Sequence, residues 1–423
     1  MRLRALLASR LGRTAGIYAL ANAINSAIPF LLLPVLTRYL SPYDYGIVAM
    51  FQVLLGVAVV LVGKSVKAAV ARQYYDKDSV DLPVYIANCL YVVVFGAALC
   101  GISIGVFSNV ISQFTAFPAH WLWAVLAVAV TQVITLLVLT LWQVQEKPLA
   151  YAKFQILLTL CNAGLSIGFV VSLGMGWQGR VSGQVLAYLA FALSGFIVLW
   201  RGGWLKWSYN HEYVKQILRY IIPLAPHALG MLAINMTDRL MITNMVGVAE
   251  MGIYVVAVQL GMVVMLLVDS FHNAWVPWFY SQLKKENIAI NLKIVKGTYV
   301  YYVGIVLAVL GYMAVLPWVI GIIVGPEFFG AQAFVFWVAM GFAFHGMYRM
   351  VTSYIFYMRK TYILGIVTFM TALINVGLNY YLIALNGVVG AAQATMIAHF
   401  ISFCLTWMLA AMVYRMPWSL KTK

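Results

Sequence analysis

Three pairs of ionisable residues lie inside long apolar stretches of this sequence. They are Asp238 with Arg239, Asp269 with His272, and His345 with Arg349. Side chains three or four residues apart share one face of an α-helix, whereas adjacent ones point about 100° apart. A carboxylate beside a histidine can bind and release a proton near neutral pH. We therefore interpret Asp238, Asp269 and His272 as candidates for coupling to an ion gradient, although a structural hydrogen-bond network explains the same spacing.

Two arginines occupy matched positions in the two halves of the chain. Arg38 precedes the sequence Asp-Tyr-Gly-Ile, and Arg239 precedes Glu-Met-Gly-Ile. Arginine binds phosphate through two parallel hydrogen bonds, so these residues are candidates for binding an anion. Further candidates are Arg349, His345, Lys64 and Lys67, the two lysines sharing a face at the inner end of the second apolar run. Extension of the side chain to the lipid headgroups, or neutralisation by a neighbouring helix, is the alternative for each.

Other kinds of chemistry have no recognisable motif here. The sequence contains no nucleophile–histidine–acid motif, no glycine-rich nucleotide loop, and no His/Cys pattern with metal-ligand spacing. The four cysteines all lie in apolar runs and are interpreted as small core residues. We expect neither an enzyme nor a cofactor or metal. The net charge of +16 comes from short basic clusters between apolar runs, which argues against nucleic-acid binding.

The composition places these residues in a membrane. Of 423 residues, 64% are hydrophobic and 9% are charged, whereas a soluble domain is about 45–50% apolar and about 25% charged. The basic N-terminus resembles a secretory signal. The run Thr14–Leu36 is too long for one, so we interpret it as a first span.

Twelve runs reach the length of about 20 residues that a spanning helix needs. The seventh includes Leu240–Val248 as an extension beyond a kink. The longest inner connections are expected at Arg72–Pro83, Arg201–Lys215 and Ser281–Lys296. The runs are Thr14–Leu36, Tyr45–Gly63, Leu82–Phe107, His120–Gln143, Tyr151–Leu173, Val181–Trp200, Lys215–Met236, Met251–Trp275, Gly297–Val324, Ala331–Tyr354, Tyr362–Leu385 and Val389–Val413.

Basic residues set the expected orientation. With the N-terminus in the cytoplasm and alternating spans, 23 of the 27 lysines and arginines fall in cytoplasmic segments. The outer loops keep Arg38 and Arg180, and the spans contain Arg239 and Arg349. This asymmetry is what the positive-inside rule predicts, so we expect both termini in the cytoplasm.

The two halves of the sequence resemble each other. The Asp/Glu-x-Gly-Ile sequences recur with an offset of 206 residues, each followed by a glutamine, Gln52 or Gln259. Gly176-Trp-Gln-Gly recurs as Gly387-Val-Val-Gly with an offset of 211 residues. The pattern predicts an all-α membrane protein of two six-helix bundles, residues 1–206 and 207–423, related by a pseudo-two-fold axis along the membrane normal.

Three stretches resemble a known family. Leu31–Gln52 (LLLPVLTRYLSPYDYGIVAMFQ), Ile222–Leu260 and Asn379–Ala398 are similar to segments of the Wzx-type polysaccharide flippases, which belong to the multidrug/oligosaccharidyl-lipid/polysaccharide exporter superfamily. The resemblance implies an inner-membrane flippase for undecaprenyl-diphosphate-linked oligosaccharide. It further implies alternating access through a cationic cavity, coupling to a proton or sodium gradient, contact with membrane lipids, and a polysaccharide polymerase and chain-length regulator as partners.

Two other members of the superfamily are the alternatives. A peptidoglycan-precursor flippase usually has two more spans than we count. A cation-coupled multidrug exporter requires an acidic cavity, whereas the intramembrane charges here are Arg38, Arg239 and Arg349 against Asp238 and Asp269. This balance favours an anionic substrate.

Overall fold

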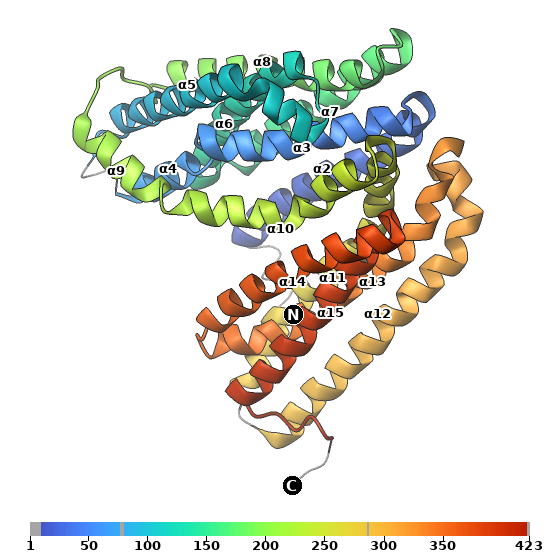
Figure 1. Ribbon diagram of the computed structural model, residues 1–423. Helices are drawn as coiled ribbons and strands as arrows, with labels where there is room; N and C mark the ends of the chain where they lie inside the picture. The colour runs from blue at the N-terminus through green and yellow to red at the C-terminus, as the bar shows by residue number, and fades with distance from the viewer. Residues whose placement is uncertain (1–9, 77–79, 286, 421–423) are drawn as a thin grey trace. The chain divides into compact units, whose positions relative to one another are not determined.

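All regular secondary structure in the described part of the chain is helical. The computed structural model describes residues 10–76, 80–285 and 287–420 (Figure 1). Eleven helical stretches in these ranges are long and apolar enough to cross a membrane, which confirms an all-α integral membrane protein. The elements are α2 (Arg10–Tyr39), α3 (Pro42–Val62), α4 (Val66–Tyr75), α5 (Leu82–Thr115), η1 (Ala119–Trp121), α6 (Leu122–Val144), α7 (Pro148–Ile167), η2 (Gly168–Ser172), α8 (Gly176–Arg201), α9 (His211–Ile221), α10 (Leu224–Met245), α11 (Val248–Leu283), α12 (Ile288–Ile323), η3 (Pro326–Ala331), α13 (Gln332–Tyr357), α14 (Tyr362–Asn386) and α15 (Val388–Val413).

The predicted seventh span is wrong in position. Residues 215–221 complete the short helix α9, and α10 then runs without a break from Leu224 to Met245. Pro223 lacks an N–H group and interrupts the helical hydrogen bonds, so the chain ends one helix and begins the next there. α10 contains Asp238 and Arg239, and it is not one of the eleven apolar stretches.

One of the expected inner connections, Ser281–Lys296, is largely helical, and another, Arg72–Pro83, begins within a helix. Val66–Tyr75 forms α4, and most of the expected loop Ser281–Lys296 belongs to α11 and α12, which end at Leu283 and begin at Ile288. Each of these two helices has 36 residues. At 1.5 Å per residue they are about 54 Å long, well beyond the roughly 30 Å of a hydrocarbon core. Their ends therefore project from the membrane.

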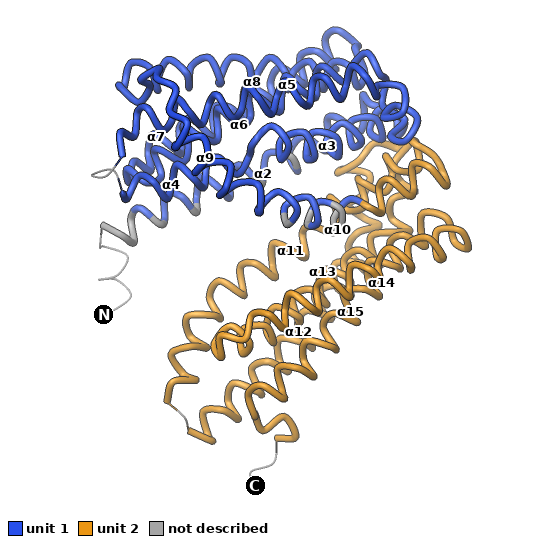
Figure 2. Tube along the Cα trace, turned by 60° about the vertical axis from the view of Figure 1, so that its left-hand side comes forward, with its two compact units in different colours: residues 1–236 blue, residues 237–423 orange. Residues whose placement is uncertain are grey.

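Contacts divide the chain into two compact units, Met1–Met236 and Thr237–Lys423 (Figure 2). This boundary lies within α10, whereas the division at residue 206 remains a prediction from the repeat. In the first unit α6 packs against α3 and α8, and α2 packs against α7. The two repeated sequences of the first half meet there, because Gln52 donates to Gln184 over 3.0 Å and the Trp177 N–H donates to Asp44 over 3.3 Å.

The segment before α9 is fastened to the first unit. The buried amide of Asn88 in α5 donates to the Ser208 carbonyl over 2.8 Å and accepts from the Asn210 N–H over 2.9 Å. Lys206 forms an ion pair with Asp81 over 3.0 Å, and this hydrogen bond lowers the pKa of the Asp81 carboxyl. The connector therefore lies against the first unit and is not a loose linker.

Asn88→Leu should destabilise this attachment. The variant keeps the size of the side chain but leaves the Asn210 N–H and the Ser208 carbonyl without their partner, at a cost of about 1–3 kcal/mol. We expect a lower melting temperature in detergent and faster proteolysis in the segment 202–210. Asn109→Leu, at an exposed position of the same helix, is the matched control. Equal melting temperatures for the two variants would contradict the assignment.

In the second unit α13 is the central helix and packs against α11, α12 and α15. Glycines allow the close approach, as small residues do in membrane helices generally. A Cβ at Gly261 would lie 2.6 Å from Val338, and one at Gly346 would lie 2.7 Å from Val268 and collide with the Tyr301 hydroxyl. These contacts fix the register of the polar residues on α11 and α13.

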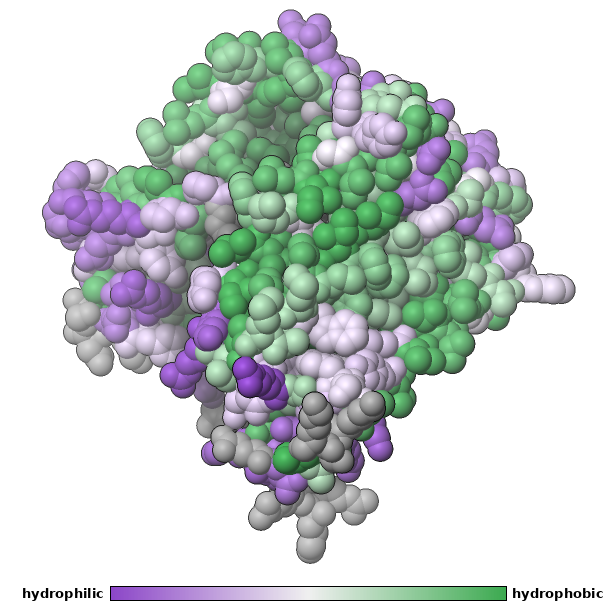
Figure 3. Space-filling model, turned by 60° about the horizontal axis from the view of Figure 1, so that its bottom comes forward, coloured by the Kyte–Doolittle hydropathy of each residue, from purple (hydrophilic) through white to green (hydrophobic). Residues whose placement is uncertain are grey.

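Large apolar side chains cover much of the surface. Trp318 is 84% exposed and Leu31 is 72% exposed. Figure 3 shows broad hydrophobic areas on the face it presents, with hydrophilic residues gathered at the edges. An apolar surface of this extent is solvated by lipid chains and not by water.

Candidate functional site

The clearest polar site of the second unit lies between α11 and α13. Arg349 donates through Nη1 to the Asp269 carboxylate, forming an ion pair between the two helices. The Arg349 side chain is 23% exposed and that of Asp269 44%, so the pair is neither dry nor fully solvated. The sequence grouped Asp269 with His272, whereas the structure gives its ion pair to Arg349.

Two histidines lie near this pair, and a third lies beside one of them. His272 is half-buried one turn from Asp269, within range of the charges of Asp269 and Arg349. His345 is near Arg349, and its ring lies 5.2 Å from that of His399 in α15 at an angle of 68°. The structure thus brings together Asp269 and His272 of α11 with His345 and Arg349 of α13. That they line a water-filled cavity remains a prediction.

His399 is a member of this cluster that the sequence analysis missed. It is a single histidine in an otherwise apolar run, without a polar neighbour at helical spacing on which a motif could be built. An ionisable residue at membrane depth was itself the available signal. The described residues contain no group of three or more His, Cys, Asp or Glu side chains arranged to hold a metal ion.

Asp238 and Arg239 of α10 do not pair with each other through their side chains. Asp238 accepts a hydrogen bond from the Tyr254 hydroxyl over 2.7 Å and another from the Arg239 backbone N–H over 2.8 Å. Each carboxylate oxygen therefore accepts a hydrogen bond within the second unit, and the charge of Arg239 also interacts with this carboxylate. The half-buried guanidinium of Arg239 has no ion pair among the described residues.

Arg38 lies in the first unit at the end of α2. Its Nη1 donates to the Pro34 carbonyl one turn earlier over 2.6 Å, and the side chain is exposed. The following helix begins with a capping box in which Ser41 and Asp44 bond each other's backbone. The guanidinium thus lies beside the turn that joins α2 to α3.

Lys64 and Lys67, expected on one helical face at the inner end of the second span, lie just beyond it on two different elements. α3 ends at Val62, and Gly63 takes a φ of +124°, which interrupts the helix before α4. Lys64 is exposed in this turn, and Lys67 is half-buried in α4. Burial, and then the charge of Lys64, lower the pKa of Lys67. The two amines remain close, but on the connection beyond the membrane helix.

Arg180 is also placed differently from the expectation. It was assigned to an outer loop, whereas it lies inside α8 and is half-buried. Its Nη1 donates to the Asn162 side chain over 3.0 Å and to the Ser166 hydroxyl over 2.8 Å, both on α7. Asn162 and Ser166 are four residues apart, which was the available signal for a polar face.

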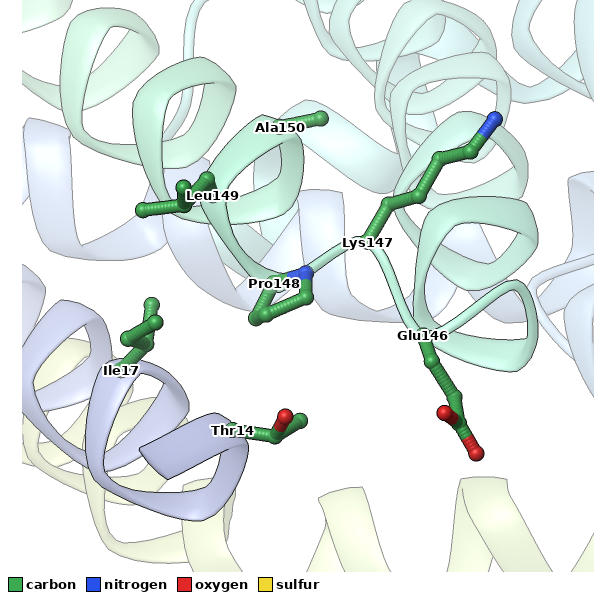
Figure 4. Close-up of a pocket in the computed structure, with 7 residues that line it drawn as sticks. All are labelled: Thr14, Ile17, Glu146, Lys147, Pro148, Leu149 and Ala150. Atoms are coloured by element: carbon green, nitrogen blue, oxygen red, sulfur yellow. The ribbon is translucent and has the colours of Figure 1, made fainter. Parts of the chain in front are cut away.

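A pocket of about 460 Å³ lies where the start of α2 meets the turn between α6 and α7 (Figure 4). Thr14 and Ile17 line one side, and residues 146–150 line the other. The figure shows the Glu146 and Lys147 side chains pointing in different directions from this turn. None of the predicted site residues lines it, so this pocket is separate from the polar sites described above.

Comparisons with known proteins agree with this architecture. The family model described as "Polysaccharide biosynthesis protein" matches residues 11–283. A protein of the Lsg locus of Haemophilus influenzae is 24% identical over 373 residues, covering 85% of this chain and 88% of that protein. An uncharacterised membrane protein of Haemophilus influenzae is 25% identical over 286 residues, covering 66% of this chain and 67% of its own.

Two solved structures share the fold. An inward-facing multidrug resistance transporter of the MATE family and MOP superfamily superposes with a TM-score of 0.68 at 15% identity, covering 94% of this chain and 98% of that one. The lipid II flippase MurJ in an inward-closed conformation superposes with a TM-score of 0.65 at 13% identity, covering 93% and 87%. These likenesses establish the two-lobed fold of that superfamily.

Proposed function

This chain belongs to the polysaccharide biosynthesis protein family, and from that membership we propose that it is a flippase and not an enzyme. Its substrate is an undecaprenyl-diphosphate-linked oligosaccharide, which it moves from the cytoplasmic to the outer leaflet of the inner membrane by alternating access. The shared fold with a lipid II flippase supports this class of substrate.

The observation that carries the proposal is that Arg239 is half-buried and forms no ion pair among the described residues. A cation at membrane depth costs about 2.5–3.5 kcal/mol on insertion scales, so it calls for a partner. The charge of Asp238 interacts with that of Arg239, but the hydrogen bonds of this carboxylate come from the Tyr254 hydroxyl and the Arg239 backbone N–H and not from the guanidinium. A diphosphate would accept hydrogen bonds from the guanidinium, whereas the organic cation of a multidrug exporter is repelled.

The proposal includes an orientation and an energy source. Both termini and the segment before α9 face the cytoplasm, as the distribution of basic residues favours. A proton or sodium gradient drives the cycle through acidic and imidazole side chains of the second unit, Asp238, Asp269 and His272. A polysaccharide polymerase and a chain-length regulator receive the product at the outer surface.

Reconstitution in proteoliposomes tests the function. A fluorescent undecaprenyl-diphosphate oligosaccharide should become accessible to an external quencher faster than in protein-free vesicles. The same lipid with a single phosphate is the matched substrate control and should move more slowly. Transport of a cationic dye without movement of the diphosphate lipid would overturn the proposal. Labelling of a His211→Cys variant by a reagent added outside the cell would contradict the proposed orientation.

A further inference from the structure

Close packing holds α8 against the end of α7 in the first unit. Gly179 and Gly183 are four residues apart, as in the small-residue pattern that lets membrane helices approach. A Cβ at Gly179 would lie 3.0 Å from the Phe169 backbone in η2, and one at Gly183 would lie 2.7 Å from the Ser166 backbone. The π-turn of η2, a feature frequent at functional sites, ends α7 at this contact.

Arg180 extends from this seam and is only partly satisfied. A guanidinium has five N–H groups, and both described hydrogen bonds, to Asn162 and Ser166, come from the single atom Nη1. The three N–H groups on Nη2 and Nε have no acceptor among the described residues. These two atoms form the edge with which arginine binds a carboxylate or phosphate through parallel hydrogen bonds.

Nothing acidic balances this charge in the described part of the first unit. The ionisable groups that interact with Arg180 are the hydroxyls of Tyr45 and Tyr188, which are neutral. Two hydrogen bonds to α7 hold the guanidinium within the lobe, so it does not simply extend to the headgroups as an arginine near a helix end otherwise does. A half-buried cation fixed in this way can bind an anion, which would supply both the counter-charge and the missing hydrogen-bond acceptors.

The repeat shows that the packing does not require an arginine. The offset of 211 residues aligns Gly179 with Gly390 and Arg180 with Ala391. The second unit makes an equally close contact there, since a Cβ at Gly390 would collide with the Leu382 carbonyl. Asn162 and Ser166 align with Leu373 and Gly377. The polar cluster of Arg180, Asn162 and Ser166 is therefore present in the first unit alone, and the helix packing does not require it.

We propose that Arg180 binds a phosphate group of the polyisoprenyl diphosphate, with Asn162 and Ser166 as positioning residues that hold its free edge open. Naming a diphosphate as the ligand rests on the proposed function. In the orientation proposed above, Arg180 lies near the outer ends of α7 and α8. It would then bind the diphosphate on the release side of the cycle, distinct from Arg239 in the second unit.

Binding by the purified protein tests this inference without requiring transport. Wild type, Arg180→Gln and Arg180→Lys are titrated in nanodiscs with inorganic pyrophosphate and with undecaprenyl diphosphate, and the dissociation constant is measured for each. Arg201→Gln removes the same charge from the exposed far end of α8 and is the matched control. We expect Arg180→Gln to weaken binding about ten-fold or more and Arg180→Lys to weaken it less, since lysine lacks the two-pronged geometry.

Three results would overturn the inference. One is equal affinity of wild type and Arg180→Gln for both diphosphates, and a second is no binding of either by wild type. The third is that phosphatidylglycerol vesicles compete for the site as well as undecaprenyl diphosphate does, which would assign the site to an ordinary anionic headgroup. A different outcome is that pyrophosphate binding depends on Arg180 but the protein moves no lipid in the flippase assay. That outcome would reject the transport proposal and keep the anion site.

Discussion

Arg349→Ala should reduce the amount of folded protein in the membrane several-fold. The substitution leaves the Asp269 carboxylate without its ion-pair partner between α11 and α13, and an unpaired charge within a bilayer is costly. Because Asp269 is 44% exposed, water screens part of this penalty, and we expect about 1–3 kcal/mol. Asp269→Asn should act in the same direction, since it strands the more buried guanidinium.

A double substitution separates stability from transport. Removing both charges, as in Asp269→Asn with Arg349→Met, should restore folded protein above either single variant, which a double-mutant cycle measures as a coupling energy. Arg359→Ala, exposed just beyond the same helix, is the matched control and should leave abundance unchanged. Single variants as abundant as the parent protein would show that the pair contributes nothing to folding.

Transport by the double variant then decides the role of the pair. If Asp269 carries the coupling ion, a well-folded double variant should lose the dependence of flipping on the gradient. Gradient-dependent transport at the parental rate would make the pair structural and leave Asp238 and His272 as the candidates for coupling.

The membrane helices and some of their ends were predictable because membrane length sets the pattern, whereas α5, α11 and α12 extend eight or nine residues beyond the predicted runs at one end. Runs such as Tyr362–Leu385 and Val389–Val413 match α14 and α15 to within a residue at each end. The bilayer imposes about 20 apolar residues per span, and every backbone group must be bonded within its helix. The prediction of the seventh span was wrong because α9 and α10 are both partly apolar. The boundary between them depends on Pro223, and a run of apolar residues does not reveal it.

Partners across helices were not predictable from spacing within one helix. The i,i+3 and i,i+4 rule placed Asp269 with His272 and His345 with Arg349 on shared faces, and the structure brings all four together. Which carboxylate meets which cation depends on the contact of α11 with α13, set by Gly346 and its neighbours. Single residues such as His399 have no spacing to analyse at all.

Lys64 shows the same limit at the end of a helix. Periodicity continued α3 through Lys64 and Lys67, whereas the positive φ of Gly63 ends the helix and turns the chain. A glycine within an apolar run is compatible with either outcome, because its conformational freedom permits a turn without requiring it. The sequence alone therefore did not show that the two lysines lie on separate elements and not on one helical face.

Arg239→Ala should cut the rate of flipping by about ten-fold or more. A charged hydrogen bond from arginine to a partly desolvated phosphate contributes about 1.5–3 kcal/mol, and each 1.4 kcal/mol is about a factor of ten. Arg239→Lys should recover part of the rate, because a point charge lacks the bidentate geometry. Arg38→Ala should weaken transport as well, since Arg38 is the matched arginine of the first half.

The structure separates this prediction from a purely structural role for Arg239. The two hydrogen bonds of Asp238 come from the Tyr254 hydroxyl and a backbone N–H, and both survive in Arg239→Ala. We therefore expect normal abundance with failed flipping. Tyr254→Phe is the contrasting variant, because it removes a donor from a side chain that is only 1% exposed and should lower abundance instead. Quantitative membrane blots and the vesicle assay measure the two properties separately. Folded Arg38→Ala and Arg239→Ala proteins that move the lipid at the parental rate would end the assignment of these arginines to the diphosphate.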